Sequence, residues 1–134
     1  MKIACLTHSS RMLGLAELIN CPDISIVFCL VAENDPDSQV VKSWCAQQRI
    51  PFFISPKRGE LPLLKGVTYD LLLTFGYPYL LSPEVINSAS YSINCHPTLL
   101  PEYRGISAVN YALRFGEPEQ GVTVHFLDAG IDTG

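Results

Sequence analysis

The sequence predicts one α/β domain over residues 1–134, built on a doubly wound, mostly parallel sheet. Two nearly continuous apolar runs, Ile24–Ala32 and Tyr69–Phe75, have the character of strands that are covered on both faces, which is typical of parallel sheets. Segments with helical spacing separate such runs, so strands and helices alternate. The length of 134 residues and the lack of repeats, low-complexity segments or linkers fit a single unit.

The first half of the chain divides into three strands and two helices. Apolar residues recur at helical spacing in the first helix, which the sequence Cys21-Pro22-Asp23 ends. A polar, proline-containing loop over Glu33–Ser38 precedes the second helix. The expected strands are Lys2–His8, Ile24–Ala32 and Pro51–Ile54, and the expected helices are Arg11–Asn20 and Val40–Gln48.

The second half continues the alternation. We expect a short helix or loop over Lys57–Gly66, which is basic and interrupted by glycine and proline. The segment Ser82–Asn87 opens with Ser-Pro-Glu, a good helix N-cap followed by proline at the first helical position. The remaining elements are the strand Tyr69–Phe75, the turn Gly76–Tyr79, the strand Tyr91–Asn94, the loop Cys95–Gly105, the helix Ile106–Phe115 and the strand Val122–Leu127.

Composition narrows the class of protein. Apolar residues make up 48% of the chain and charged residues 16%, so it should bury a real core. The net charge of −4 argues against a dedicated nucleic-acid or anionic-membrane surface. No apolar run approaches a membrane span and the first residues lack the layout of a signal peptide. Five cysteines without a CxxC pair favour reduced, buried thiols of a cytoplasmic protein over disulfides or a zinc site.

Ligands of open α/β sheets bind beyond the carboxyl ends of the strands. We expect three segments to reach that edge: Gly76–Leu81, Asn94–Gly105 and Asp128–Gly134. They would bring together Asn94, His96 and Asp132, and the first two would point to one side of an extended strand. A carboxamide, an imidazole and a carboxylate suit the addition of a nucleophile to a carbonyl, with donors for the oxyanion and a path for the proton.

Taken residue by residue, structural interpretations compete with these roles. Asn-x-His is common in polar loops, and an aspartate before glycine usually belongs to a turn. His125 lies mid-strand and fits a hydrogen-bonded structural residue, whereas His8 ends the first strand and could touch a ligand. Ser9-Ser10-Arg11 lies where an anion could bind, but Ser9 or Ser10 as a helix N-cap is the simpler interpretation. The chain has no nucleotide-binding fingerprint and no nucleophile elbow.

Several motifs in order carry a resemblance that covers Ser92–Gly134. They are Asn94-Cys95-His96-Pro97, Thr98-Leu99-Leu100-Pro101, Tyr103-Arg104-Gly105, Gly121-Val122-Thr123-Val124-His125 and Asp132-Thr133-Gly134. This stretch resembles the signature region of the folate-dependent formyltransferases, a family that includes glycinamide ribonucleotide transformylase, methionyl-tRNA formyltransferase and amino-sugar N-formyltransferases. Gly76–Pro83 and the opening strand extend the resemblance loosely, and it implies a Rossmann-like fold.

The resemblance implies roles for specific residues. Asn94, His96 and Asp132 would occupy the catalytic positions, and 10-formyltetrahydrofolate would be the formyl donor, without a metal. The pterin ring would lie between two segments, contacted largely by backbone. The implied donor-binding residues are Pro78, Tyr79, Leu80, Leu81, Asp128, Ala129, Gly130 and Ile131.

The acceptor is expected to be a small-molecule amine, such as an amino sugar. The segment Thr7–Met12 lacks the glycine-rich phosphate loop of glycinamide ribonucleotide transformylase, which argues against a phosphoribosyl substrate. Tyr103-Arg104-Gly105 looks more like the methionyl-tRNA and amino-sugar branches, so tRNA stays open as an acceptor. The residues we expect to bind the substrate are His8, Ser10, Arg11 and Arg104.

Two alternatives to a transferase remain at this point: a hydrolase that releases formate from the same folate, and a non-catalytic domain that only binds folate. The chain stops at Gly134, directly after a strand and a turn, so we expect a C-terminally truncated part of a longer catalytic domain.

Overall fold

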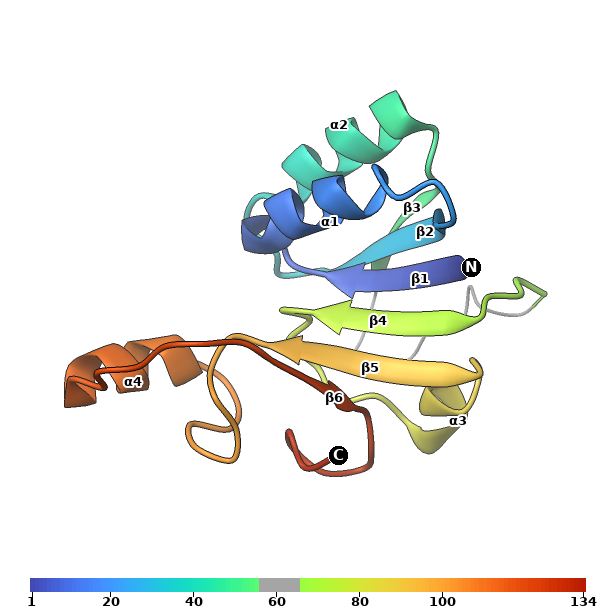
Figure 1. Ribbon diagram of the computed structural model, residues 1–134. Helices are drawn as coiled ribbons and strands as arrows, with labels where there is room; N and C mark the ends of the chain where they lie inside the picture. The colour runs from blue at the N-terminus through green and yellow to red at the C-terminus, as the bar shows by residue number, and fades with distance from the viewer. Residues whose placement is uncertain (56–65) are drawn as a thin grey trace.

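A computed structural model of the chain describes residues 1–55 and 66–134, and the predicted element over 57–66 lies almost wholly outside them. The described strands form one six-stranded sheet in the order β3-β2-β1-β4-β5-β6 (Figure 1). Neighbours are parallel except β5 and β6, which confirms the predicted mostly parallel, doubly wound sheet. The strands are β1 (Lys2–Thr7), β2 (Ser25–Ala32), β3 (Phe52–Ser55), β4 (Leu71–Phe75), β5 (Tyr91–His96) and β6 (Thr123–Phe126).

Helices lie on both faces of the sheet. The helices α1 (Met12–Leu18) and α2 (Ser38–Gln48) cover one face, where Leu15, Val41 and Cys45 pack against residues of β1, β2 and β4 (Figure 1). The short helix α3 (Pro83–Ile86) packs on the other face through Val85. The helix α4 (Ala108–Phe115) extends beyond the carboxyl end of β5 (Figure 1).

The caps of two helices can be compared with the sequence. Ser82 has the predicted N-cap role, because its side chain accepts a hydrogen bond from the backbone N–H of Val85. The prediction that Ser9 or Ser10 is an N-cap is wrong. The cap of the 3-10 turn Ser9–Arg11 is His8, whose Nδ1 accepts from the backbone N–H of Ser10.

The structure corrects one boundary among the last strands. β5 continues beyond the predicted end at Asn94 to His96, so His96 lies in the strand rather than in the following loop. β6 runs antiparallel to β5, with Thr123 opposite His96 and Phe126 opposite Ile93. The end of β6 therefore points away from the carboxyl edge, and 127–134 must fold back to return toward it (Figure 1).

Asp35 connects the loops that follow β1 and β2. Its side chain is buried, with 5% of the residue exposed, and it accepts hydrogen bonds from the backbone N–H groups of Ser9 (2.7 Å) and Asp37 (3.1 Å). Burial alone would raise the pKa of Asp35, but the hydrogen bonds from Ser9 and Asp37 outweigh it and hold this pKa below the ordinary value. The ionised carboxylate thus anchors the end of β1, where the chain enters the turn before α1.

All five cysteines are free thiols, and the predicted burial holds for three of them. Cys5, Cys29 and Cys45 are fully buried in the core beneath α1 and α2, whereas Cys21 is exposed. The contact with the Cys29 thiol and burial both raise the pKa of Cys45, so this thiol stays protonated. Within the described residues, no helix has both the length and the apolar character that crossing a bilayer requires.

The buried position of Leu72 gives a test of the core. Leu72 is fully buried and lies on β4, the strand between β1 and β5. Leu72→Ala should therefore lower the free energy of unfolding by about 2–5 kcal/mol. The matched substitution Leu13→Ala removes the same atoms from a side chain that is 87% exposed and should change it by less than about 0.5 kcal/mol. Chemical denaturation of both variants measures the difference; equal losses would contradict this description of the core.

The carboxylate of Asp35 should make stability depend on pH. Because the pKa of Asp35 is lower in the folded chain than its ordinary value of 3.8, its contribution is complete above that value and disappears as the pH falls through the folded pKa. The free energy of unfolding of Asp35→Asn should therefore be lower than that of the unsubstituted chain at pH 7, and the gap should close in acid. Asp37→Asn changes an exposed carboxylate without a capping bond and serves as the control. A gap that stays constant from pH 7 to 3 would refute the role.

Candidate active site

Asn94 is held at the centre of a polar cluster on β5. Its neighbour Ile93 packs in the core beneath α1 and α2, so the Asn94 side chain points to the opposite face. The amide oxygen accepts a hydrogen bond from the hydroxyl of Thr74 on β4 (2.8 Å). The amide nitrogen donates to Oδ1 of Asp132 (3.1 Å) and lies 3.1 Å from Nε2 of His125.

Asp132 brings a carboxylate to this cluster from the returning segment after β6. Its backbone has φ 51°, in the left-handed region that aspartate tolerates better than most residues. Besides the bond from Asn94, Oδ2 accepts the backbone N–H of Gly105 (2.7 Å) and lies 3.4 Å from Nδ1 of His96. The side chain is 13% exposed, so these contacts form largely out of water. The predicted convergence of Asn94, His96 and Asp132 is confirmed.

His96 is buried, with 4% of the residue exposed, and both of its ring nitrogens face oxygen acceptors. Nδ1 faces the Asp132 carboxylate, and Nε2 lies 2.9 Å from the backbone carbonyl of Tyr103. The hydroxyl of Thr98 reaches the same carbonyl at 3.4 Å, and the Tyr103 hydroxyl donates to Glu117. A proton on Nε2 therefore has an acceptor within the chain.

His125 also belongs to the cluster, although the sequence favoured a purely structural role for it. It lies opposite Asn94 in the β5–β6 register, and its side chain is 6% exposed. Nδ1 lies 2.8 Å from the Phe126 carbonyl, while Nε2 lies near Asn94 and 3.4 Å from Oδ1 of Asp132. A donating Nδ1 leaves Nε2 free to accept from Asn94. The antiparallel register of β6 places this residue beside Asn94, and the sequence specifies neither the direction nor the register of that strand.

The segments expected to bind the donor follow β4 and β6. In the first, Tyr79 donates a hydrogen bond to Asn34 and packs its ring edge-on against Tyr77, while Leu80 is 61% exposed.

In the second segment, after β6, the Asp128 carboxylate accepts hydrogen bonds from Gly130 and Thr133. The hydroxyl of Thr133 and the backbone N–H of Gly130 lower the pKa of Asp128. Among the described residues, no hydrogen bond, ion pair or ring contact joins these two segments, so the donor-binding assignment of 78–81 and 128–131 stays a prediction.

The residues expected to bind the substrate lie in two places. His8, Ser10 and Arg11 follow β1, where Nδ1 of His8 lies 2.9 Å from the Ser10 hydroxyl and the Arg11 guanidinium lies 5.9 Å from the Phe75 ring centre. Gly76 allows this packing, because a Cβ there would come within 3.0 Å of the Arg11 side chain. Arg104, in the loop after β5, is exposed. Their substrate-binding role stays a prediction.

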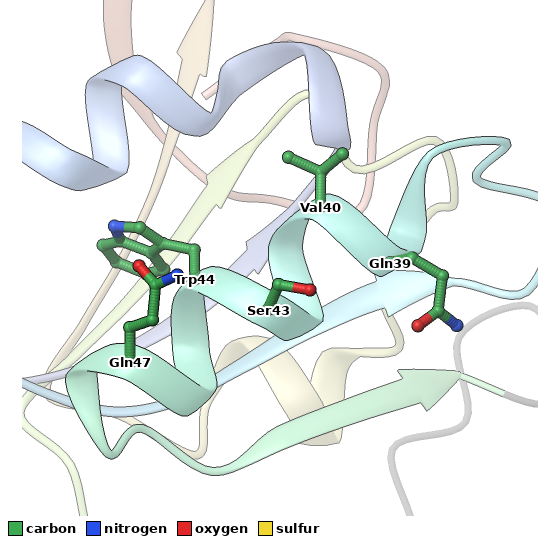
Figure 2. Close-up of a pocket in the computed structure, with 5 residues that line it drawn as sticks. All are labelled: Gln39, Val40, Ser43, Trp44 and Gln47. Atoms are coloured by element: carbon green, nitrogen blue, oxygen red, sulfur yellow. The ribbon is translucent and has the colours of Figure 1, made fainter.

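A hollow elsewhere on the surface does not compete with the polar cluster as an active site. It has a volume of about 490 Å³ and lies on the outer side of α2, lined by Gln39, Val40, Ser43, Trp44 and Gln47 (Figure 2). All five residues come from one helix and none is ionisable, whereas active sites bring together polar groups from several elements. Within residues 1–55 and 66–134, no group of three or more His, Cys, Asp or Glu side chains could hold a metal ion.

Comparison with known proteins shows to which family the chain belongs. The family model described as "Formyl transferase" matches residues 56–134. The methionyl-tRNA formyltransferase of Thermosynechococcus vestitus is 33% identical over 106 residues, which cover 75% of this chain and 32% of that protein. The trifunctional purine biosynthetic protein adenosine-3 of Drosophila melanogaster is 44% identical over 72 residues, 53% of this chain and 5% of that protein. The chain thus spans about a third of the first relative and far less of the second.

Solved structures share the arrangement of strands and helices. Phosphoribosylglycinamide formyltransferase from Bacillus halodurans superposes with a TM-score of 0.81 at 24% identity, over all of this chain and 75% of that chain. Glycinamide ribonucleotide transformylase 1 from Geobacillus kaustophilus gives 0.77 at 28% identity, over 99% and 77%. A sugar N-formyltransferase from Shewanella sp. gives 0.74 at 15% identity, over 100% and 54%, and shows the fold alone. With the family model covering more than half of its residues, this chain belongs to the formyltransferase family.

Proposed function

We propose that the protein containing this chain transfers a formyl group from 10-formyltetrahydrofolate to an amine. The observation that carries the proposal is the meeting of Asn94, His96 and Asp132 in one largely buried cluster, within a chain of the formyltransferase family. Two hydrogen-bond donors beside a carboxylate suit a reaction in which negative charge develops on a carbonyl oxygen.

In this mechanism the nitrogen of the acceptor amine attacks the formyl carbon. The amide of Asn94 and Nε2 of His96 donate hydrogen bonds to the oxygen that becomes negative, while Asp132, 3.4 Å from Nδ1, orients the His96 ring. The new carbon–nitrogen bond forms, the bond from the formyl carbon to N10 of the folate breaks, and the proton lost by the amine goes to N10. His96 and Asp132 provide the path for that proton.

The Tyr103 carbonyl supports this role for His96. It is a neutral oxygen acceptor 2.9 Å from Nε2, the distance at which a reacting formyl oxygen would also accept a hydrogen bond. An oxyanion is a stronger acceptor than a peptide carbonyl, so exchange of one for the other favours the transition state. The exchange requires the Tyr103 backbone to move away from His96.

We assign the acceptor to small-molecule amines, such as amino sugars. The net charge of −4 and the lack of a glycine-rich phosphate loop at Thr7–Met12 support this class over a nucleic acid or a phosphoribosyl compound. Arg104 is exposed and directly follows Tyr103, whose carbonyl lies against His96, so we expect it to contact an acceptor that approaches His96. A panel of amines with 10-formyltetrahydrofolate, tested on the complete gene product, would identify the acceptor, with tRNA as one member of the panel.

The variant His96→Ala tests the catalytic assignment. It removes one donor to the oxyanion, so kcat should fall by about 10²–10³-fold or more while the fold is retained. Gln47→Ala, in the hollow on α2, is the control and should keep full activity. Release of tetrahydrofolate measures the rate, and circular dichroism measures folding. Near-normal turnover in a folded His96→Ala variant would contradict the proposed function.

Arg104 should act on binding rather than on the chemical step. Arg104→Ala should raise the KM for the acceptor about tenfold or more, as expected for a lost hydrogen bond to a charged group, with little change in kcat. Arg114→Ala removes another exposed arginine, on α4, and should leave both constants unchanged. A fall in kcat for Arg104→Ala at constant acceptor KM would contradict the assignment.

A further inference from the structure

Thr74 is a buried polar residue that the proposed mechanism does not use. It lies on β4, directly beside Asn94 of β5 in the parallel register, and 5% of the residue is exposed. Its hydroxyl donates to the amide oxygen of Asn94 at 2.8 Å, while its distance to the Ile93 carbonyl is 3.4 Å. The shorter and stronger of these two hydrogen bonds is the one to Asn94.

The orientation of the Asn94 amide decides whether this residue can stabilise an oxyanion. In the observed orientation the NH₂ group faces Asp132 and His125, and the oxygen faces Thr74. The flipped amide would place its oxygen against the Asp132 carboxylate, which accepts hydrogen bonds only. Asp132 and Thr74 therefore hold the amide from opposite ends, one accepting and one donating.

We propose that Thr74 is a positioning residue for Asn94, an inference that rests on the proposed formyl transfer. Its hydroxyl fixes the amide oxygen, so that the N–H groups face the side on which the oxyanion forms. A hydrogen bond to the amide oxygen also draws electron density from the nitrogen and makes its N–H groups better donors. Such preorganisation strengthens binding of the transition state.

The contacts of Asn94 differ in what they would do during the reaction. For an N–H of Asn94 to reach the oxyanion, one of its two present partners has to give way. An imidazole nitrogen such as Nε2 of His125 (3.1 Å) is a weaker acceptor than the Asp132 carboxylate. Thr74 bonds to the oxygen end, which the reaction does not need. Its bond can therefore persist throughout and keep the amide from rotating as a partner is exchanged.

The test compares Thr74→Val, which removes the hydroxyl at nearly constant shape, with Thr74→Ser, which keeps it. With the complete gene product, Thr74→Val should lower kcat about tenfold at unchanged KM for both substrates, and Thr74→Ser should restore most of the rate. Ser92→Ala is the matched control, because it removes a buried hydroxyl from β5 that bonds to the Ile86 carbonyl and not to Asn94. If Thr74→Val unfolds, Thr74→Ala and Thr74→Ser supply the same comparison.

A second readout separates positioning from the proposed function. The side-chain amide signals of Asn94 in ¹H–¹⁵N spectra, assigned by their loss in Asn94→Asp, should shift in Thr74→Val and stay in place in Thr74→Ser and Ser92→Ala. If the unsubstituted protein transfers no formyl group but these shifts occur, the proposed function fails and the positioning by Thr74 stands. Active protein with unchanged Asn94 signals and unchanged kcat in a folded Thr74→Val variant would overturn the inference.

Discussion

The carboxylate of Asp132 lies against groups from three separate parts of the chain. Asn94 and His96 of β5 and the backbone N–H of Gly105, in the loop after β5, contact it, and Nε2 of His125 on β6 lies 3.4 Å from it. A carboxylate that is 13% exposed carries a desolvation cost, which donors on several sides offset. If this side chain were absent, the amide of Asn94, the ring of His96 and the Gly105 backbone would each lose a partner together, so the site depends on this one residue.

The groups around that carboxylate differ in how firmly the fold holds them. Thr74, Asn94, His96 and His125 all belong to strands at the centre of the cluster, and neighbouring strands fix their relative positions through the register. The Tyr103 carbonyl and Asp132 itself come from segments outside the strands. Side chains fixed in strands, beside a backbone carbonyl on a loop that can move, suit a reaction in which the substrate must replace that carbonyl at His96.

Much of this arrangement could be predicted from the sequence. The apolar runs Ile24–Ala32 and Tyr69–Phe75 predicted buried parallel strands, and the two-residue spacing of Asn94 and His96 predicted a shared face. The antiparallel direction of β6 could not be predicted, because a short run such as Val122–Leu127 has the same pattern in either direction. For the same reason His125 was missed as a neighbour of Asn94, and the cap at His8 depended on a loop geometry that the residues alone do not specify.

The pairing of β5 with β6 restricts where the polypeptide can change in length. Side chains alternate along β6, with Val124 and Phe126 more than half exposed and His125 turned toward Asn94. A single inserted residue ahead of His125 within the strand would exchange the two faces and present an aliphatic or aromatic group to the amide. The exposed connection over 117–120, between α4 and β6, can accept added residues without any such exchange. We therefore expect the connection over 117–120 to tolerate added residues, and an insertion between Thr123 and His125 to disrupt the site.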